Sequence, residues 1–213
     1  MKAEDQKNLY DALHDRVVNG EFPAERRLRP DVFADEYKCS ASTIREILFR
    51  LSTVGLVDFR EQRGFRMPPM SIERKNDLTR FRIVLECEGA CLSIRQGGLA
   101  WEARLSAAHH KLSHIEAHIP GKEADSEVMA LWTLAELEFH QTLIDACGSD
   151  ILKSTHAVIY QQFRQQMITT DRTFQFLPEN VIQHQAILAA ALAHDEPAMR
   201  DTITAHLLRN VVE

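Results

Sequence analysis

The sequence predicts a mainly α-helical protein, with an N-terminal winged helix-turn-helix followed by an all-α antiparallel bundle of six to seven helices. Three observations predict this fold class. Apolar residues recur at helical spacing along most of the 213 residues. Glycine and proline divide the first third into short segments and are rare afterwards. One stretch near residue 60 alternates between apolar and polar residues, which is the pattern of a short hairpin.

Three helices are predicted before the hairpin. An amphipathic helix covers 5–18, and a second helix begins near Asp31. The third helix is capped by Ser40 or Ser42, and its apolar residues keep helical spacing as far as Gly55. Three helices in this order, followed by a hairpin, are typical of a winged helix-turn-helix.

The segment LVDFREQRGFRM carries Gly64 near its centre and predicts two short strands around a basic loop. The prolines and methionine at 68–70 suit neither a helix nor a strand and indicate a linker. Helices are expected at 72–96, 100–118, 124–147, 150–170, 179–194 and 196–211. The expected domains are 1–68 for the winged helix-turn-helix, 69–75 for the linker and 76–213 for the helical domain.

Composition excludes several classes of protein. No run of about 18 apolar residues is present, so we expect no membrane partner. The N-terminus lacks the apolar centre of a secretory signal, and the four cysteines lack C-x-x-C spacing, which indicates reduced thiols and a cytoplasmic protein. The net charge of −6 argues against a uniformly basic chain, yet residues 1–70 hold 12 basic and 12 acidic residues and can still gather arginines on one face.

The third helix and the hairpin have the side chains of a DNA-reading surface. Small polar residues and arginines in the first turns of a recognition helix can reach phosphates or base edges, and an arginine beside glycine at a wing tip can enter the minor groove. The predicted DNA contacts are Arg29, Ser40, Ser42, Thr43, Arg45, Arg50, Arg63 and Gly64. The alternative is an ordinary helix pair and hairpin with solvated arginines.

The stretch FADEYKCSASTIREILFRLSTVGLVDFREQRGFRM resembles the DNA-binding domain of the GntR family of bacterial transcription regulators. The resemblance lies in the order of a turn serine, an arginine-glutamate helix, a glycine-leucine-valine end and an arginine-glycine wing. It implies a bacterial transcription regulator, expected to be a repressor. We expect a homodimer on a two-fold DNA operator, because one small domain has too little interface for specific binding in a genome. The family's usual arginine after the turn serine is Ala41 here, so we expect a different operator sequence.

The ten histidines fall into two groups. In HHKLSHIEAH, His110, His114 and His118 recur every four residues among polar neighbours that include Glu116, and a solvated helix face is the favoured interpretation. Its outer members are about 12 Å apart at helical rise, so the three cannot share one ion, although adjacent members could hold one.

The second group is dispersed over three predicted helices. Glu136 lies one turn before His140, and His184 and His206 flank the break at 195–197, so that an antiparallel helix pair could bring them together. Three imidazoles and one carboxylate suit Zn²⁺, Ni²⁺ or Mn²⁺. Taken singly, each histidine is more often a satisfied core or surface residue than a ligand.

Residues 76–213 resemble the FCD ligand-binding domain found in the FadR branch of the same family. The matching motifs are RIVLE from Arg82, ELEFH from Glu136, Gln183-His184, and the region from Met199 to His206-Leu207. In metal-binding members of that branch an aspartate and three histidines are the ligands. The resemblance therefore implies a divalent metal at Glu136, His140, His184 and His206, with glutamate in place of aspartate.

The same resemblance implies a small organic acid as effector. Arg82 is a candidate partner for its carboxylate, because a guanidinium can bind a carboxylate through two hydrogen bonds. An intrahelical pair with Glu86 is an equally good interpretation of Arg82. Gln162 and Arg164 are further effector-binding candidates.

Three functions remain open from the sequence. The first is the ligand-responsive DNA-binding regulator. The second is a metal-dependent enzyme with Glu136 or Glu138 as base, although the sequence shows no activated nucleophile and no phosphate loop. The third is a regulator whose histidines are structural and whose effector is held by arginines alone.

Overall fold

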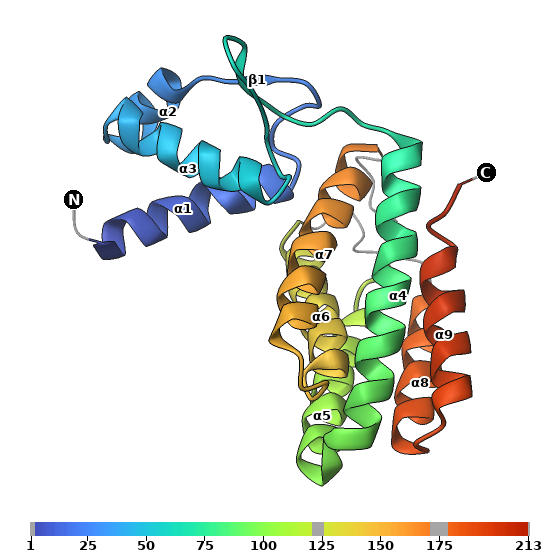
Figure 1. Ribbon diagram of the computed structural model, residues 1–213. Coiled ribbons are helices and arrows are strands. Elements are labelled where there is room, and N and C mark those ends of the chain that lie inside the picture. Colours follow the sequence, from blue (N-terminus) through green and yellow to red (C-terminus); the bar gives the residue numbers. More distant parts are fainter. Residues whose placement is uncertain (1–2, 121–125, 171–178, 213) are drawn as a thin grey trace. The chain divides into compact units, whose positions relative to one another are not determined.

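The computed structural model describes residues 3–120, 126–170 and 179–212 and divides the chain into two compact units. The first unit comprises the residues up to Lys75 together with the end of one long helix from Tyr160 onward. Its elements are α1 (Ala3–Val18), β1 (Arg27–Leu28), α2 (Pro30–Tyr37), α3 (Ala41–Thr53), β2 (Asp58–Arg60) and β3 (Gly64–Arg66) (Figure 1).

Local sequence explains where the helices of the first unit begin and end. Pro30 occupies the first turn of α2, where its missing N–H costs nothing. The helix stops at Lys38, which adopts a left-handed conformation. Ser40 then caps α3 by accepting a hydrogen bond from the backbone N–H of Thr43 at 3.1 Å. The apolar faces of these helices and strands pack into one hydrophobic core, whose members lie between Leu9 and Met67 in the sequence.

The predicted hairpin belongs to a three-stranded antiparallel sheet in the order β1-β3-β2. Phe59 pairs with Phe65 within the hairpin, and Arg27 of β1 pairs with Arg66 of β3. Strand β1 was absent from the sequence prediction. It is two residues long, too short to show alternation, and forms by pairing with β3.

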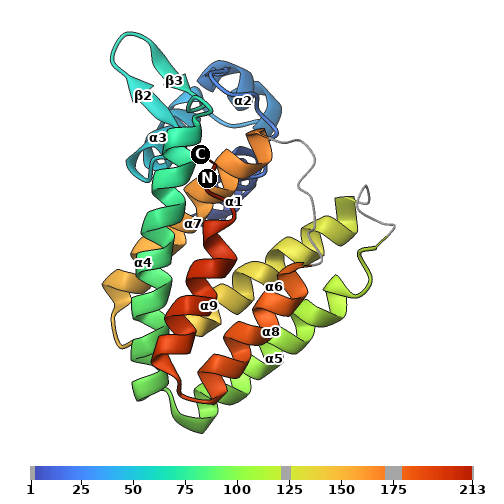
Figure 2. The ribbon, with the colours of Figure 1, turned by 90° about the vertical axis from the view of Figure 1, so that its right-hand side faces the viewer.

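The second unit is all helical in its described part. Its helices are α4 (Ile72–Gln96), α5 (Gly98–Glu116), α6 (Ser126–Ile144), α7 (Asp150–Thr170), α8 (Glu179–Leu192) and α9 (Glu196–Leu208). Helix α5 packs against α6 and α8, and α8 packs against α9 (Figure 2). Ion pairs from Arg95 to Glu196 and from Arg200 to Glu88 join α4 to α9.

These helices match the six expected from the sequence to within a few residues at each end. Helix α4 begins at Ile72, inside the linker expected at 69–75, so the non-helical connection covers only 67–71. Helix α7 is divided between the units at Tyr160, which the sequence did not predict. None of the described helices is both long enough and apolar enough to cross a membrane.

Candidate functional site

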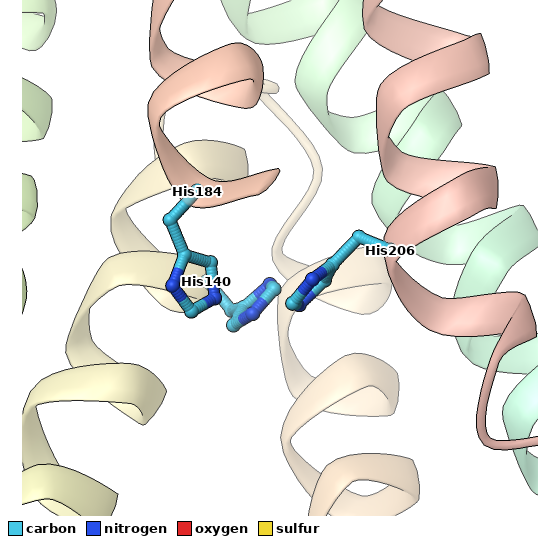
Figure 3. A group of neighbouring side chains, drawn as sticks. All are labelled: His140, His184 and His206. Carbon is cyan, nitrogen blue, oxygen red and sulfur yellow. The ribbon is translucent and has the colours of Figure 1, made fainter. Parts of the chain in front are cut away.

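Three buried imidazoles converge inside the second unit. His140 comes from α6, His184 from α8 and His206 from α9, and Figure 3 shows their rings turned toward one another. One nitrogen of each ring lies within 4.8 Å of the corresponding nitrogen of the other two. The ring centroids of His184 and His206 are 4.6 Å apart. The predicted meeting of these three side chains is therefore present in the fold.

A separate acceptor holds the outer nitrogen of each imidazole. His140 Nδ1 lies 2.8 Å from a carboxylate oxygen of Glu86, and His184 Nδ1 lies 3.0 Å from Glu116. His206 Nδ1 lies 3.1 Å from the amide oxygen of Gln183. Because carboxylate and amide oxygens only accept hydrogen bonds, each Nδ1 carries the proton and each Nε2 keeps its lone pair.

The inner nitrogens are poorly satisfied by the protein. The Nε2 atoms of His140 and His184 are buried and have no hydrogen-bond partner in the part of the chain that the structure describes. Buried polar atoms are nearly always hydrogen-bonded, so a pair of orphaned lone pairs that converge calls for a ligand. Imidazoles oriented by an outer acceptor with a free inner lone pair are the arrangement that metal-binding histidines adopt.

Glu136 lies beside this cluster, one helical turn before His140. Its Oε1 atom is 3.6 Å from His140 Nε2 and 3.9 Å from a terminal nitrogen of Arg82, and its side chain is 14% exposed. The ligand atoms that lie within 4.8 Å of one another belong to the three histidines, and the Glu136 carboxylate lies beside this group. The structure therefore brings the three predicted histidines together and places the fourth predicted ligand next to His140.

A buried ionic network supports the cluster from α4. Glu86 is fully buried and accepts hydrogen bonds from Arg82, from His140 and, at 2.9 Å, from His156 of α7. Burial alone would raise the pKa of Glu86, but the charge of Arg82 and the two imidazoles outweigh it and hold that pKa well below its usual value. The carboxylate is thus a permanent anion that orients His140.

The same burial keeps two of the candidate ligands neutral. Desolvation lowers the pKa of His140, and it lowers the pKa of His206 further, where the neighbouring His184 adds to the effect. A neutral imidazole is the form that binds a metal ion. His140 and His206 are therefore in their ligating form at neutral pH.

The predicted effector residues have separate positions. Arg82 is buried and donates its Nε–H to Glu86, so the intrahelical pair that the sequence left open is present. Gln162 and Arg164 lie on the part of α7 that belongs to the first unit. There the Gln162 amide donates to the Val54 carbonyl at 3.0 Å, and Arg164 donates to the Asn19 side chain at 3.0 Å. These bonds give both residues a structural role in the first unit.

Sequence reasoning missed several residues of the second unit, among them His156, which binds Glu86. Glu116 was assigned to a polar, solvated face, but it is 1% exposed and binds His184. Its spacing of four residues from buried Leu112 would have indicated an inward position. Gln183 and Arg209 were also not predicted as partners: the Arg209 guanidinium donates to the Gln183 oxygen at 2.9 Å. The exposed positions expected for His110, His114 and His118 are present.

The candidate DNA-reading helix is α3. Ser42 and Arg45 are exposed near its beginning. Ser40 and Thr43 lie at the same end, but their hydroxyls are 2.9 Å apart and serve the helix cap. The Arg50 guanidinium lies over the Tyr10 ring, 4.2 Å from its centroid, and Arg29 forms an ion pair with Asp31.

The wing presents more arginines than the sequence prediction included. Gln62 and Gly64 have positive φ angles of 63° and 73°, and no atom lies within 4 Å of a Cβ built on Gly64. Arg63 is exposed at this turn. A groove of about 480 Å³ is lined by Arg63, Gly64, Arg27, Arg60 and Arg66, with Glu25 and Asp58 among the acidic members. A second groove of about 380 Å³ is lined by Arg29, Arg45 and Gly64. Of the three missed arginines, Arg60 and Arg66 lie on the predicted hairpin, whereas Arg27 could be placed beside it only through the pairing of β1 with β3.

Comparison with known proteins finds a family match for each end of the chain. Residues 5–67 match the model described as bacterial regulatory proteins, gntR family, and residues 77–209 match the FCD domain. The HTH-type transcriptional regulator BphR of Paraburkholderia xenovorans is 30% identical over 93% of this chain and 80% of its own length. The HTH-type transcriptional repressor GlaR of Escherichia coli is 29% identical over 93% of this chain and 90% of its own.

Solved structures show the same fold at lower sequence identity. E. coli McbR/YncC is 18% identical, with a TM-score of 0.75 over 99% of this chain and 96% of its own. A putative GntR transcriptional regulator from Rhodococcus sp. RHA1 is 19% identical, also with a TM-score of 0.75, over 97% and 95% of the two chains. The order of a winged helix-turn-helix and a helical unit with an inward histidine cluster, together with these matches, shows that the chain belongs to the GntR family of DNA-binding transcription regulators and carries an FCD domain rather than an enzyme's active site.

Proposed function

We propose that the FCD domain of this regulator binds one divalent metal ion and a small carboxylate effector. The inner nitrogens of His140, His184 and His206 are the metal ligands, and Glu136 is the fourth. The convergence of three buried imidazoles whose outer nitrogens are already held by acceptors is the observation that carries the proposal.

The donor set limits the choice of metal. Three imidazoles and one carboxylate suit Zn²⁺, Ni²⁺ or Mn²⁺, and four protein ligands leave positions open on a metal that prefers six. A carboxylate effector can fill such positions when the metal is bound. Glu136 is one methylene longer than aspartate, so its reach rather than its charge sets the geometry at the fourth ligand.

DNA is read by the first unit. We assign Ser42 and Arg45 of α3 to base edges or phosphates, and Arg63 beside Gly64 to the minor groove. Four other predicted contacts support this surface indirectly, since their side chains have partners within the unit. They are Ser40, Thr43, Arg29 and Arg50. A single module of this size buries too little surface for specific binding in a genome, which favours a homodimer on a two-fold operator.

The effector acts by preferring one of two states of the regulator. A ligand shifts DNA affinity only if it binds the DNA-competent and incompetent states differently, and the coupling is reciprocal. Repression is the proposed mode, on the ground that the relative GlaR is a repressor.

Elemental analysis of the purified protein tests the metal site. We expect about one equivalent of a divalent metal per chain, lost in His184→Ala and retained in His114→Ala, because His114 is exposed and outside the cluster. A metal content that His184→Ala leaves unchanged would contradict the site. It would support instead an effector held by arginines around structural histidines.

A further inference from the structure

Arg209 lies just after α9, and its guanidinium donates a hydrogen bond to the neutral amide oxygen of Gln183 rather than to a carboxylate. Its Nε atom is buried and has no hydrogen-bond partner among the described residues. Burial lowers the pKa of Arg209 even though Glu136 and Glu179 act in the opposite direction. Arg209 is half-buried, and a guanidinium whose Nε is shut off from water is destabilised unless an anion accepts its hydrogen bonds, so this position favours an anion.

Arg209 is directly connected to the candidate metal centre. Gln183 Oε1 accepts from both Arg209, at 2.9 Å, and His206 Nδ1, at 3.1 Å, so the guanidinium and a candidate metal ligand meet at one oxygen atom. Arg82, the other cation nearby, is already bound to the buried carboxylate of Glu86. Arg82 thus donates to a carboxylate, whereas Arg209 donates to a neutral amide oxygen.

Other buried polar atoms near the cluster also have no hydrogen-bond partner within the part of the chain that the structure describes. They include His109 Nε2, Glu116 Oε2 and Asn180 Oδ1, from α5 and α8. The side chains of all three residues are less than a tenth exposed. Orphaned polar atoms gathered on the helices around one site indicate that a polar ligand completes it.

The charges of this interior explain why a metal would be needed. Among the described residues, the carboxylates of Glu86, Glu116 and Glu136, with the exposed Glu179 beside them, outnumber the guanidiniums of Arg82 and Arg209. One divalent ion offsets this negative excess. An anion is therefore bound less readily by the metal-free site than by the metal-loaded one.

We propose, building on the metal site proposed above, that Arg209 binds the carboxylate of the effector and that this binding requires the metal. The effector is then a small organic acid with one carboxylate on the Arg209 guanidinium and a further oxygen on the metal. A guanidinium can bind that carboxylate through two hydrogen bonds, which an ammonium cannot do.

Titration of the zinc-loaded full-length protein with simple acids tests the proposal. Acetate, malonate, succinate and citrate are first ranked by thermal shift, and the acid that binds best is titrated calorimetrically. We expect Arg209→Gln to weaken its binding about 10- to 100-fold, as for the loss of a buried charged hydrogen-bonding partner. Arg209→Lys is expected to be intermediate. Zinc content should stay at the wild-type level in both variants.

Arg200→Gln is the matched control, because Arg200 lies on α9, which Arg209 directly follows, but forms an exposed ion pair with Glu88. It should bind the acid within about twofold of wild type, the range expected when a surface pair is lost. If Arg209→Gln does not fold, Arg209→Lys decides: affinity within twofold of wild type contradicts the role of Arg209, and a clear loss supports it.

The other outcomes separate this inference from the proposed function. If Arg209→Gln binds the acid as wild type does while His184→Ala does not, the metal and effector site stands and the role of Arg209 is wrong. Equal binding to chelator-treated protein contradicts the charge argument. If no acid binds the zinc-loaded protein, both the Arg209 assignment and the carboxylate effector are wrong, and the metal site is judged by metal content alone.

Discussion

At the scale of single residues, the candidate metal centre depends on the acceptors behind the ligands as much as on the ligands. Glu86, Glu116 and Gln183 each hold one Nδ1–H and thereby fix both the tautomer and the ring orientation. Trp132 also donates to Glu116, at 3.3 Å. Loss of one acceptor would free a ring to rotate without removing any metal ligand.

Glu116→Gln tests this role. The amide is nearly the same size but lacks the charge that polarises the His184 imidazole, so we expect metal affinity to fall about 10- to 100-fold. Competition with a chromogenic chelator measures the affinity. The control is Glu138→Gln, because Glu138 lies on α6 and forms an exposed ion pair with Lys111. This substitution should leave the metal affinity unchanged. Equal affinities for Glu116→Gln and wild type would show that the acceptor does not matter.

His109→Phe tests the effect of a buried imidazole on stability. Desolvation, with a contribution from His184, lowers the pKa of His109 below 6.5. The unfolded chain therefore takes up a proton more readily than the folded one, and stability falls as the pH drops from 6.5 towards the lower folded value. We expect His109→Phe to lose less unfolding free energy than wild type between pH 7.5 and 5.5.

The measurement is urea unfolding of the chelator-treated proteins at both pH values. The effect cannot exceed about 1.4 kcal/mol for each unit by which the pKa is lowered. His110→Gln, at the adjacent and exposed position, is the control and should follow wild type. A steeper loss in His109→Phe than in wild type would contradict the direction of the pKa shift.

Some residue roles could be predicted and others could not. His140, His184 and His206 are recognisable from their spacing and from the resemblance to FCD domains, since each lies on a helix with apolar neighbours. The role proposed for Arg209 could not be predicted, because it depends on which of the nearby carboxylates already have hydrogen-bond partners. That information exists only after folding.

At the scale of elements, the helix ends follow from capping residues and the strands do not follow from alternation alone. Ser40 and Asp195 accept backbone hydrogen bonds at the starts of α3 and α9, and Ser40 is one of the two caps that the sequence predicted for α3. Strand β1 forms only because β3 offers unpaired backbone groups opposite it. Pairing between distant segments is the information that a local pattern lacks.

Ser40→Ala separates capping from DNA contact. Loss of the hydrogen bond to the Thr43 N–H should lower the unfolding free energy by about 1 kcal/mol, with little change in intrinsic DNA affinity. Ser42→Ala, at an exposed position of the same helix, should show the reverse. Urea unfolding and fluorescence anisotropy with DNA measure the two quantities. A stable Ser40→Ala protein with weakened DNA binding would assign Ser40 to the DNA.

At the scale of the whole molecule, the chain is a regulator with two units that share one helix. The prolines at 68–69 indicated the boundary after the first unit, but nothing indicated that α7 would be divided. Its amides explain the division: Gln165 donates to the carbonyls of Leu56 and Val17, and Gln162 to that of Val54. In the sequence, glutamines on a long helix cannot be told from solvated residues. Their role becomes clear only when the backbone carbonyls to which they donate are known.

The central claim is that a metal-dependent site in the FCD domain controls DNA binding. The most direct measurement is fluorescence anisotropy of the full-length protein on duplex DNA from upstream of its own gene, with and without metal and the best-binding acid. We predict specific, salt-sensitive binding whose Kd the acid changes about 5- to 150-fold, only in the metal-loaded protein. His184→Ala should bind the DNA and ignore the acid. A wild-type Kd that neither the acid nor a chelator changes, or a His184→Ala response equal to wild type, would contradict the account.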